Sequence, residues 1–252
     1  MFLLVSGASA VIAALAMFVT AYAARRSGRV SVVDVTWGVT LAVVALACAV
    51  LGDSSPARRW LLVVLVGLWG LRLSWHIFKR SRGHGEDPRY ATLLAAGPGG
   101  ALLKVWIPQG ISIWFVSWPL QVAAVADGRL GVVAWIGVAL WVVGVLFESL
   151  GDAQLAAYKA DPDRGPVMDR GLWGWTRHPN YFGDACVWWG LWLIAADVWP
   201  GVLTIASPIV MTYFLVFATG ARLLEKTMMK RPGYPAYAAR TSMFFPLPPK
   251  TR

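Results

Sequence analysis

One segment, GLWGWTRHPNYFGD, combines charged, amide and aromatic groups that suit the binding of an anionic ligand. Pro179 in this segment fits the first turn of a helix, where its missing N–H is not needed. A helix start offers free backbone N–H groups and the positive end of the helix dipole, which favour phosphate. Arg170 and Arg177 add positive charge, and Asn180 and Asp184 can hydrogen-bond an amide or a ribose. The segment therefore predicts an anion site, although a proline with flanking arginines also begins helices that bind nothing.

A second cluster of basic and aromatic residues follows the last apolar run. It mixes Lys230, Arg231 and Arg240 with Tyr234 and Tyr237. Guanidinium groups bind phosphate in a bidentate way and stack on aromatic rings, so this mixture suits a phosphorylated aromatic cofactor. The alternative is a basic amphipathic tail that lies on anionic membrane lipid.

The elements that carry these residues are predicted to be membrane helices. Of 252 residues, 58% are apolar and 14% charged, and the mean hydropathy is +0.58. This composition requires lipid as the solvent for most of the chain. Because about 20 residues span a bilayer, the length allows one all-α polytopic membrane domain, 1–252, and little else. Apolar runs bounded by charges, Gly or Pro predict about seven spans: Phe2–Ala23, Val30–Leu51, Trp60–Phe78, Ile107–Ala126, Leu130–Gly151, Tyr181–Ala196 and Val202–Leu224.

The net charge of +10 comes from short basic clusters between the apolar runs rather than from one stripe. This pattern does not indicate nucleic-acid binding, and we interpret it as a topology signal with contacts to anionic ligands. Most of the 23 Lys and Arg residues follow the first, third, fifth and seventh runs. The positive-inside bias then predicts an N-terminus outside and a C-terminal tail in the cytoplasm.

With this topology, the ionisable residues within or at the ends of the runs fall in the cytoplasmic half. A charged side chain in hydrocarbon costs roughly 2.5–3.5 kcal/mol, so these groups are expected to converge on a polar interior. The alternative is that they reach water or pair at helix ends. The outer acidic residues Asp53, Asp127 and Asp197 are expected in loops. The inner set is Asp34, Arg72, His76, Glu148, Asp152, Asp184, Arg222 and Glu225.

Several of these motifs resemble the steroid 5-alpha-reductase C-terminal family, and more closely its bacterial branch, long catalogued only as a domain of unknown function. The most specific part is Arg-His-Pro-Asn-Tyr-x-Gly-Asp, which begins at Arg177. The remaining matches touch most of the chain: Val33-Asp34-x-x-Trp37, Arg72-x-x-x-His76, Gly85-Glu-Asp-Pro-Arg-Tyr90, Glu225, Tyr234-x-x-Tyr237 and Thr241-x-x-Phe244-x-Pro246.

This resemblance implies a seven-helix reductase of a bacterial inner (plasma) membrane that binds NADPH from the cytoplasm. It would reduce a carbon–carbon double bond, conjugated to a carbonyl, in a lipidic or steroid-like substrate taken from the bilayer. Residues 1–106 would form the substrate half, and 107–252 the cofactor half with a cytoplasmic tail over 225–252. Membrane lipids are the other expected partner, and oligomeric state is not predicted.

The resemblance also implies which residues contact the nucleotide. Asn180 and Asp184 match the family's nucleotide-contacting Asn and acidic residue, and Asp152 matches an Asp near the end of the fifth helix. No Gly-x-Gly-x-x-Gly follows a predicted strand, so NADPH would be held without a Rossmann domain. No metal site is expected. The further expected contacts are Arg170, Arg177, His178, Tyr181, Arg222, Glu225, Tyr234, Tyr237 and Arg240.

The substrate half departs from the steroid enzymes, which use a Gln-Glu pair in the second helix and a Tyr in the third. Here the second run offers Asp34, and the third offers Arg72 and His76 with no Tyr. In a conjugate reduction an acid must polarise or protonate the carbonyl oxygen, and these three residues are the catalytic candidates. Asp34 kept protonated by desolvation, or His76, could be that acid. The alternatives are a structural Asp34–Arg72 bridge and an interfacial histidine.

Two rival functions fit part of the pattern. An isoprenylcysteine carboxyl methyltransferase-like enzyme shares Arg-His-Pro-x-Tyr and would use S-adenosylmethionine, but the paired Glu of such enzymes is Glu225-Lys226 here. A transporter should place its polar groups near the bilayer midplane and between repeats, whereas this chain gathers them at one face and has no repeat.

Overall fold

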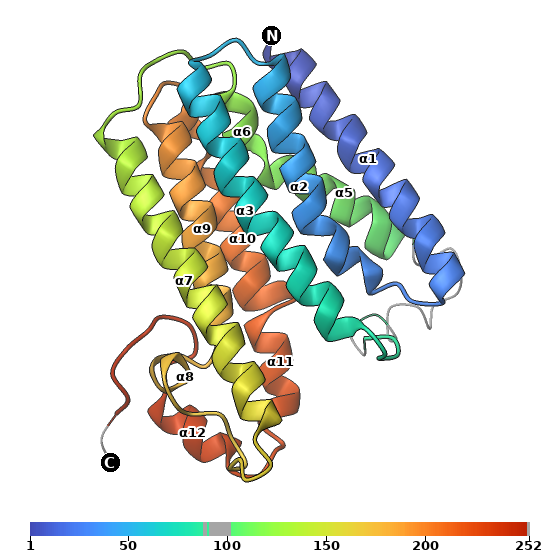
Figure 1. The fold of residues 1–252 in the computed structure, drawn as a ribbon, viewed down its shortest axis with the longest axis vertical. Coiled ribbons are helices and arrows are strands. Elements are labelled where there is room, and N and C mark those ends of the chain that lie inside the picture. The colour runs from blue at the N-terminus through green and yellow to red at the C-terminus, as the bar shows by residue number, and fades with distance from the viewer. Residues whose placement is uncertain (88–89, 91–101, 251–252) are drawn as a thin grey trace. The chain divides into compact units, whose positions relative to one another are not determined.

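The computed structural model of this chain describes residues 1–87, 90 and 102–250 (Figure 1). The described residues are mainly helical and contain no β-strand, which confirms the all-α prediction. Pro88 and Arg89 of the Gly85–Tyr90 motif lie outside the described residues. Two compact units make up the fold, one from residues 1–133 and 194–207 and the other from 134–193 and 208–252.

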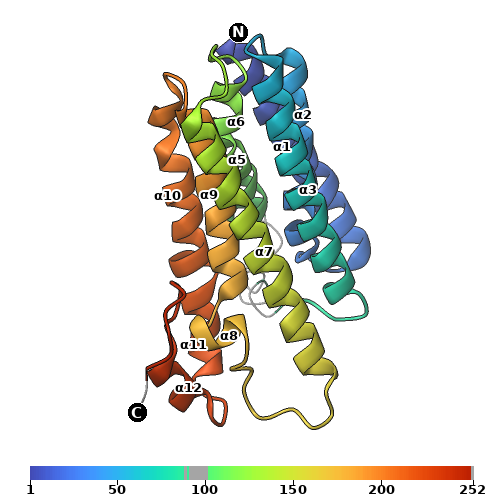
Figure 2. The same cartoon turned by 60° about the vertical axis from the view of Figure 1, so that its left-hand side comes forward.

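In the first unit, three long helices lie side by side in both views (Figure 1 and Figure 2). Gly38 and Gly70 let two of them approach closely, because a Cβ on Gly70 would lie 2.4 Å from the carbonyl oxygen of Gly38. The first long helix ends at Gly28, whose φ of 68° is readily adopted by glycine. The helices of this unit are α1 (Phe2–Ser27), α2 (Val32–Leu51), α3 (Pro56–Ser81), the π-helix η1 (Leu102–Trp106), α5 (Ile107–Val116), α6 (Trp118–Ala123) and the 3-10 helix η2 (Gly201–Ile205).

In the second unit, glycines at regular spacing join its two principal helices, α7 (Val132–Ala160) and α9 (Pro179–Ala196). A Cβ on Gly183 would lie 2.5 Å from the carbonyl oxygen of Gly144, and one on Gly190 would lie 2.6 Å from that of Gly137. Small residues are the usual means by which membrane helices bring their backbones together. The other helices are α8 (Leu172–Trp175), α10 (Ala206–Tyr213), the π-helix η3 (Phe214–Ala218), α11 (Ala221–Met228) and α12 (Tyr234–Arg240).

Within the part of the chain that the structure describes, five helical segments are long and apolar enough to cross a membrane. They correspond to five of the seven predicted spans, and they indicate an integral membrane protein. The predicted span Ile107–Ala126 is divided between α5 and α6 at Ser117, because Pro119 lacks the N–H that would continue the ladder. The predicted span Tyr181–Ala196 lies within α9, which has 18 residues and begins at Pro179. The five segments are Phe2–Ser27, Val32–Leu51, Pro56–Ser81, Val132–Ala160 and Gly201–Met228.

A buried ion pair in the first unit involves one of the acidic residues expected in a loop. Asp197 does lie in a turn, but its Oδ2 accepts hydrogen bonds from Arg58 Nη2 at 2.9 Å and from the Gly131 N–H at 2.8 Å. The Arg58 side chain is fully buried and also donates to the carbonyl of Arg129 at 2.8 Å. The sequence analysis therefore did not predict a buried ion pair on the predicted outer side.

Candidate functional site

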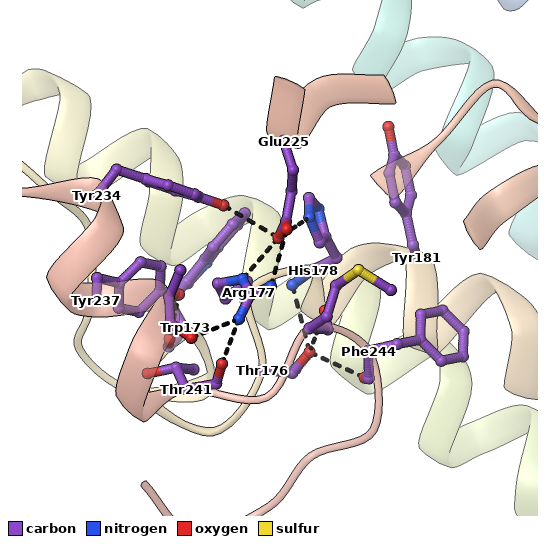
Figure 3. A network of polar contacts seen from close by, with 12 residues as sticks. Trp173, Thr176, Arg177, His178, Tyr181, Glu225, Tyr234, Tyr237, Thr241 and Phe244 are labelled. Carbon is purple, nitrogen blue, oxygen red and sulfur yellow. Dashed lines mark hydrogen bonds and ion pairs between the residues drawn. The ribbon is translucent and has the colours of Figure 1, made fainter. Parts of the chain in front are cut away.

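A carboxylate surrounded by hydrogen-bond donors forms the centre of the second unit's polar network (Figure 3). Arg177 donates from Nε to Glu225 Oε1 at 2.6 Å and from Nη2 to Oε2 at 2.8 Å. His178 Nε2 lies 3.2 Å from Oε1, and the Tyr234 hydroxyl lies 3.3 Å from the same oxygen. We call Arg177, His178, Glu225 and Tyr234 the Glu225 cluster. Its bidentate Arg–carboxylate geometry is the strong form of charge-assisted hydrogen bond.

The remaining donors of Arg177 bind the C-terminal segment. Its Nη1 donates to the carbonyl oxygens of Ala238, at 2.9 Å, and of Thr241, and its backbone N–H donates to the carbonyl of Ser242 at 2.9 Å. Thr176 Oγ1 donates to the carbonyl of Phe244 at 2.9 Å. These hydrogen bonds join residues 176–178 to residues 241–244. The two segments belong to separate motifs of the sequence but pack together in the structure.

One of the two buried tyrosines of α12, Tyr237, connects this helix to α8. The Tyr237 hydroxyl donates to the carbonyl of Trp173, whose indole Nε1 donates to the carbonyl of Gly151 on α7 at 3.0 Å. Burial raises the pKa of both Tyr234 and Tyr237, and the nearby charge of Glu225 raises each pKa further. Both phenols therefore stay protonated near neutral pH and serve as hydrogen-bond donors.

Arg177 is charged, and its ion pair with Glu225 raises the pKa of its guanidinium. Burial alone would lower the pKa of this guanidinium, but the hydrogen bonds and charge of Glu225 outweigh burial and raise it. The ion pair is mostly shielded from water, with side chains 11% and 14% exposed. Arg177 was predicted to contact a cofactor, and its contacts here are a carboxylate and backbone carbonyls.

Other predicted cofactor residues lie where α7 meets the start of α9. As the sequence predicted, α9 begins at Pro179, which packs against Gly151. Asp152 and Asp184 are buried within this unit, and Asn180 accepts the Tyr181 N–H at 3.1 Å. The Tyr181 ring stacks on His178 with centroids 5.5 Å apart (Figure 3). The Tyr181 ring therefore lies directly beside the Glu225 cluster.

Three predicted arginines occupy more open positions. Arg170 and Arg222 are exposed, and the Arg222 guanidinium lies 4.5 Å from the centroid of the Phe217 ring. Arg240 pairs with Asp169. The structure thus brings part of the predicted set into one cluster and leaves these cations at the surface of the unit.

The catalytic candidates lie in the first unit. Asp34, in the first turn of α2, accepts a hydrogen bond of 2.6 Å from the hydroxyl of Tyr90 to its Oδ1. Arg72 and His76 lie one turn apart on α3 and are partly buried. Sequence reasoning assigned no role to Tyr90, because it looked for a tyrosine only within the third helix. The usable signal was its place at the end of the Gly85–Tyr90 motif.

Apolar pockets also occur in the first unit, away from charged groups. One of about 410 Å³ lies between α1, η1 and α5, and another of about 480 Å³ lies between α1 and α2. Small residues such as Ala10, Ala14 and Gly110 open the first pocket, and Trp106 and Phe18 line it. Both sites suit a hydrophobic ligand or an acyl chain.

Comparison with known proteins places the chain in a family. Residues 19–241 match the family described as "Protein of unknown function (DUF1295)". An uncharacterised protein of Schizosaccharomyces pombe is 25% identical over 227 residues, which cover 78% of this chain and 66% of that protein. The chain thus spans just under two thirds of that relative's length. No solved structure matches. Because the family match extends over most of its length, the chain belongs to the DUF1295 family.

Proposed function

We propose that the protein is a membrane-embedded, NADPH-dependent reductase of a carbon–carbon double bond conjugated to a carbonyl in a lipidic or steroid-like substrate. The resemblance of its motifs to steroid 5-alpha-reductases is the starting point. The observation that carries the proposal is the 2.6 Å hydrogen bond from Tyr90 to Asp34. It supplies a carboxyl–phenol pair at the start of α2, the helix in which the steroid enzymes have their own carboxylate.

The Asp34–Tyr90 pair has the chemistry that the carbonyl end of such a substrate requires. The single O–H of Tyr90 donates to Asp34 in the structure, and in the substrate complex it would instead donate to the carbonyl oxygen. Addition of hydride at the β-carbon and of a proton at that oxygen would give the enol, which returns to the carbonyl form when the α-carbon gains a proton and the oxygen loses one. NADPH, when bound, would supply the hydride. Asp34 and Tyr90 would orient the carbonyl and deliver the proton.

The residues of the second unit fit a phosphorylated dinucleotide by their chemistry. Exposed Arg170 and Arg222 are suitable phosphate partners, and Asn180, Asp152 and Asp184 offer groups that bind an amide or ribose hydroxyls. The Glu225 cluster would hold the start of α9 and the C-terminal segment in the relative position that these contacts need. Tyr181, His178, Tyr237 and Arg240 would line or support the same site.

The proposal includes a topology. Seven spans, with the N-terminus outside and the tail after Glu225 in the cytoplasm, would let NADPH enter from the cell interior while the substrate enters from the inner membrane of a bacterium. The distribution of Lys and Arg supports this orientation.

Activity measurements on point variants test the proposal. Purified protein in detergent should oxidise NADPH when given members of a panel of steroid and lipid enones. Tyr90→Phe removes the donated hydrogen bond and should lower kcat/KM about 100-fold, the usual contribution of a general acid. Asp34→Asn should have a comparable effect. The control is Tyr22→Phe, because Tyr22 is exposed on α1 and its hydroxyl accepts a hydrogen bond from Arg26.

Two results would contradict the proposal. Undiminished turnover in Tyr90→Phe would remove the assigned acid. A thermal midpoint that rises with S-adenosylmethionine and not with NADPH would replace the reductase by the methyltransferase alternative.

A further inference from the structure

The start of α2 lacks a local cap. The capping position is Ser31, and its side chain makes no capping hydrogen bond. The first N–H groups of a helix have no partner within the helix and need one from elsewhere. A distant residue, Glu86, binds the N–H groups just before the helix: one carboxylate oxygen accepts the Val30 N–H, and the other accepts the Ser31 N–H of the capping position at 3.0 Å.

The segment that carries Glu86 also carries Tyr90. The Asp87 N–H donates to Glu86 Oε1 at 2.9 Å, and the Tyr90 N–H donates to the carbonyl of Asp87 at 2.9 Å. These hydrogen bonds connect the start of α2, through Glu86 and Asp87, to Tyr90, whose hydroxyl donates to Asp34. A separate bond of 3.0 Å, from Arg29 Nη1 to the carbonyl of Ser81, fixes the same segment where it leaves α3.

We infer that Glu86 is a positioning residue, whose carboxylate ties the segment after α3 to the start of α2 and thereby holds the Tyr90 hydroxyl on Asp34. The inference rests on the proposed function, since it concerns the same carboxyl–phenol pair. It adds a residue to which neither composition nor family gives a role. The Glu86 carboxylate binds backbone N–H groups, so it acts through the backbone.

The charge of Glu86 is consistent with this role. Burial would raise the pKa of its carboxyl group, but the backbone N–H groups of Val30, Ser31 and Asp87 and the Ser31 side chain outweigh burial and lower it. The group is therefore ionised at neutral pH. A carboxylate at the positive end of a helix dipole is also favourably placed.

A spectroscopic experiment tests the positioning directly. 3-Fluorotyrosine is placed at position 90 of the full chain in detergent, and its ¹⁹F resonance is recorded for the parent and for variants. Asp34→Asn defines the resonance of a phenol that has lost its carboxylate. Glu86→Gln and Glu86→Ala should move the resonance in the same direction, toward the Asp34→Asn position. Arg82→Gln, an exposed charge change on the same segment, should leave it in place.

The outcomes separate the inference from the proposed function. If Glu86→Gln, which keeps the shape of the side chain, leaves the resonance at the parent position while Asp34→Asn moves it, Glu86 is only a helix cap and the inference is wrong. If Asp34→Asn leaves it unmoved, the pair itself is absent and both fail. If the Glu86 variants move it but no enone is reduced, the positioning stands and the reductase proposal fails.

Discussion

At the scale of single residues, the Glu225 cluster differs from what its motifs predicted. The motifs predicted Arg177, His178, Glu225 and Tyr234 as residues of one cofactor site. It treated them as separate contacts to a ligand, whereas they contact one another across 48 positions of sequence. A motif identifies residues that act together, but it contains no information on whether their hydrogen bonds go to a ligand or to each other. That distinction depends on tertiary geometry.

The cluster makes a stability prediction. Glu225→Gln removes the charge that three donors share and leaves the Arg177 guanidinium shielded from water without a counter-ion. Because the pair is mostly buried, we expect a loss of about 2–3 kcal/mol, less than for a fully buried pair. Thermal unfolding in detergent should show a midpoint lower by about 5–10 °C. Lys226→Gln, the exposed neighbour, is the control and should change little. An unchanged midpoint in Glu225→Gln would mean that the cluster is not a structural tie.

At the scale of helices, the sequence predicted where the helices lie better than how they pack. The runs around α1, α2, α3 and α7 follow directly from long apolar stretches, because a backbone in lipid must satisfy its own hydrogen bonds. The break at Ser117 was not predicted, although Pro119 is a visible signal. Nor did periodicity reveal that the glycines of α7 and α9 face each other, because a glycine in an apolar run is equally compatible with lipid contact.

The glycine contact gives a prediction about helix packing. Gly144→Ala would place a Cβ 2.5 Å from the carbonyl oxygen of Gly183, so the two backbones must separate. We expect a cost of about 1–3 kcal/mol, typical of overpacking, seen as a lower thermal midpoint. The matched control is Gly67→Ala on α3, where nothing lies within 4 Å of the added Cβ. That change should be neutral or stabilising, since alanine favours a helix over glycine. Equal effects at the two positions would contradict the close packing of α7 on α9.

At the scale of the whole molecule, composition alone predicted an all-α membrane protein, and the helices bear that out. The predicted division at 106/107 remains a prediction; the structure groups α5 and α6 with the first unit. Contacts between distant helices depend on side-chain fit, which hydropathy does not encode, so the sequence alone gives no such grouping. The sequence analysis also expected the ionisable residues of the apolar runs to gather in the cytoplasmic half, and the buried Arg58–Asp197 pair is the exception.

The orientation of the chain in the membrane is also a prediction at the scale of the whole molecule. A reporter that is active only in the cytoplasm, fused after the last residue of the chain, should be active, and one fused before Met1 should be silent. The basic residues that follow the odd-numbered runs are the physical reason. The reverse pattern would place the Glu225 cluster on the outer face and remove the access of NADPH to it.

Binding of NADPH to the purified protein tests the central claim most directly. At a concentration of about 100 times Kd, the cofactor should stabilise the protein by about 2.7 kcal/mol and raise the thermal midpoint by several degrees. The double variant Asn180→Ala, Asp184→Asn should lose this shift, and Asp163→Asn, an exposed change in the same unit, should keep it. A midpoint that does not respond to NADPH, or a shift of equal size in both variants, would contradict the account.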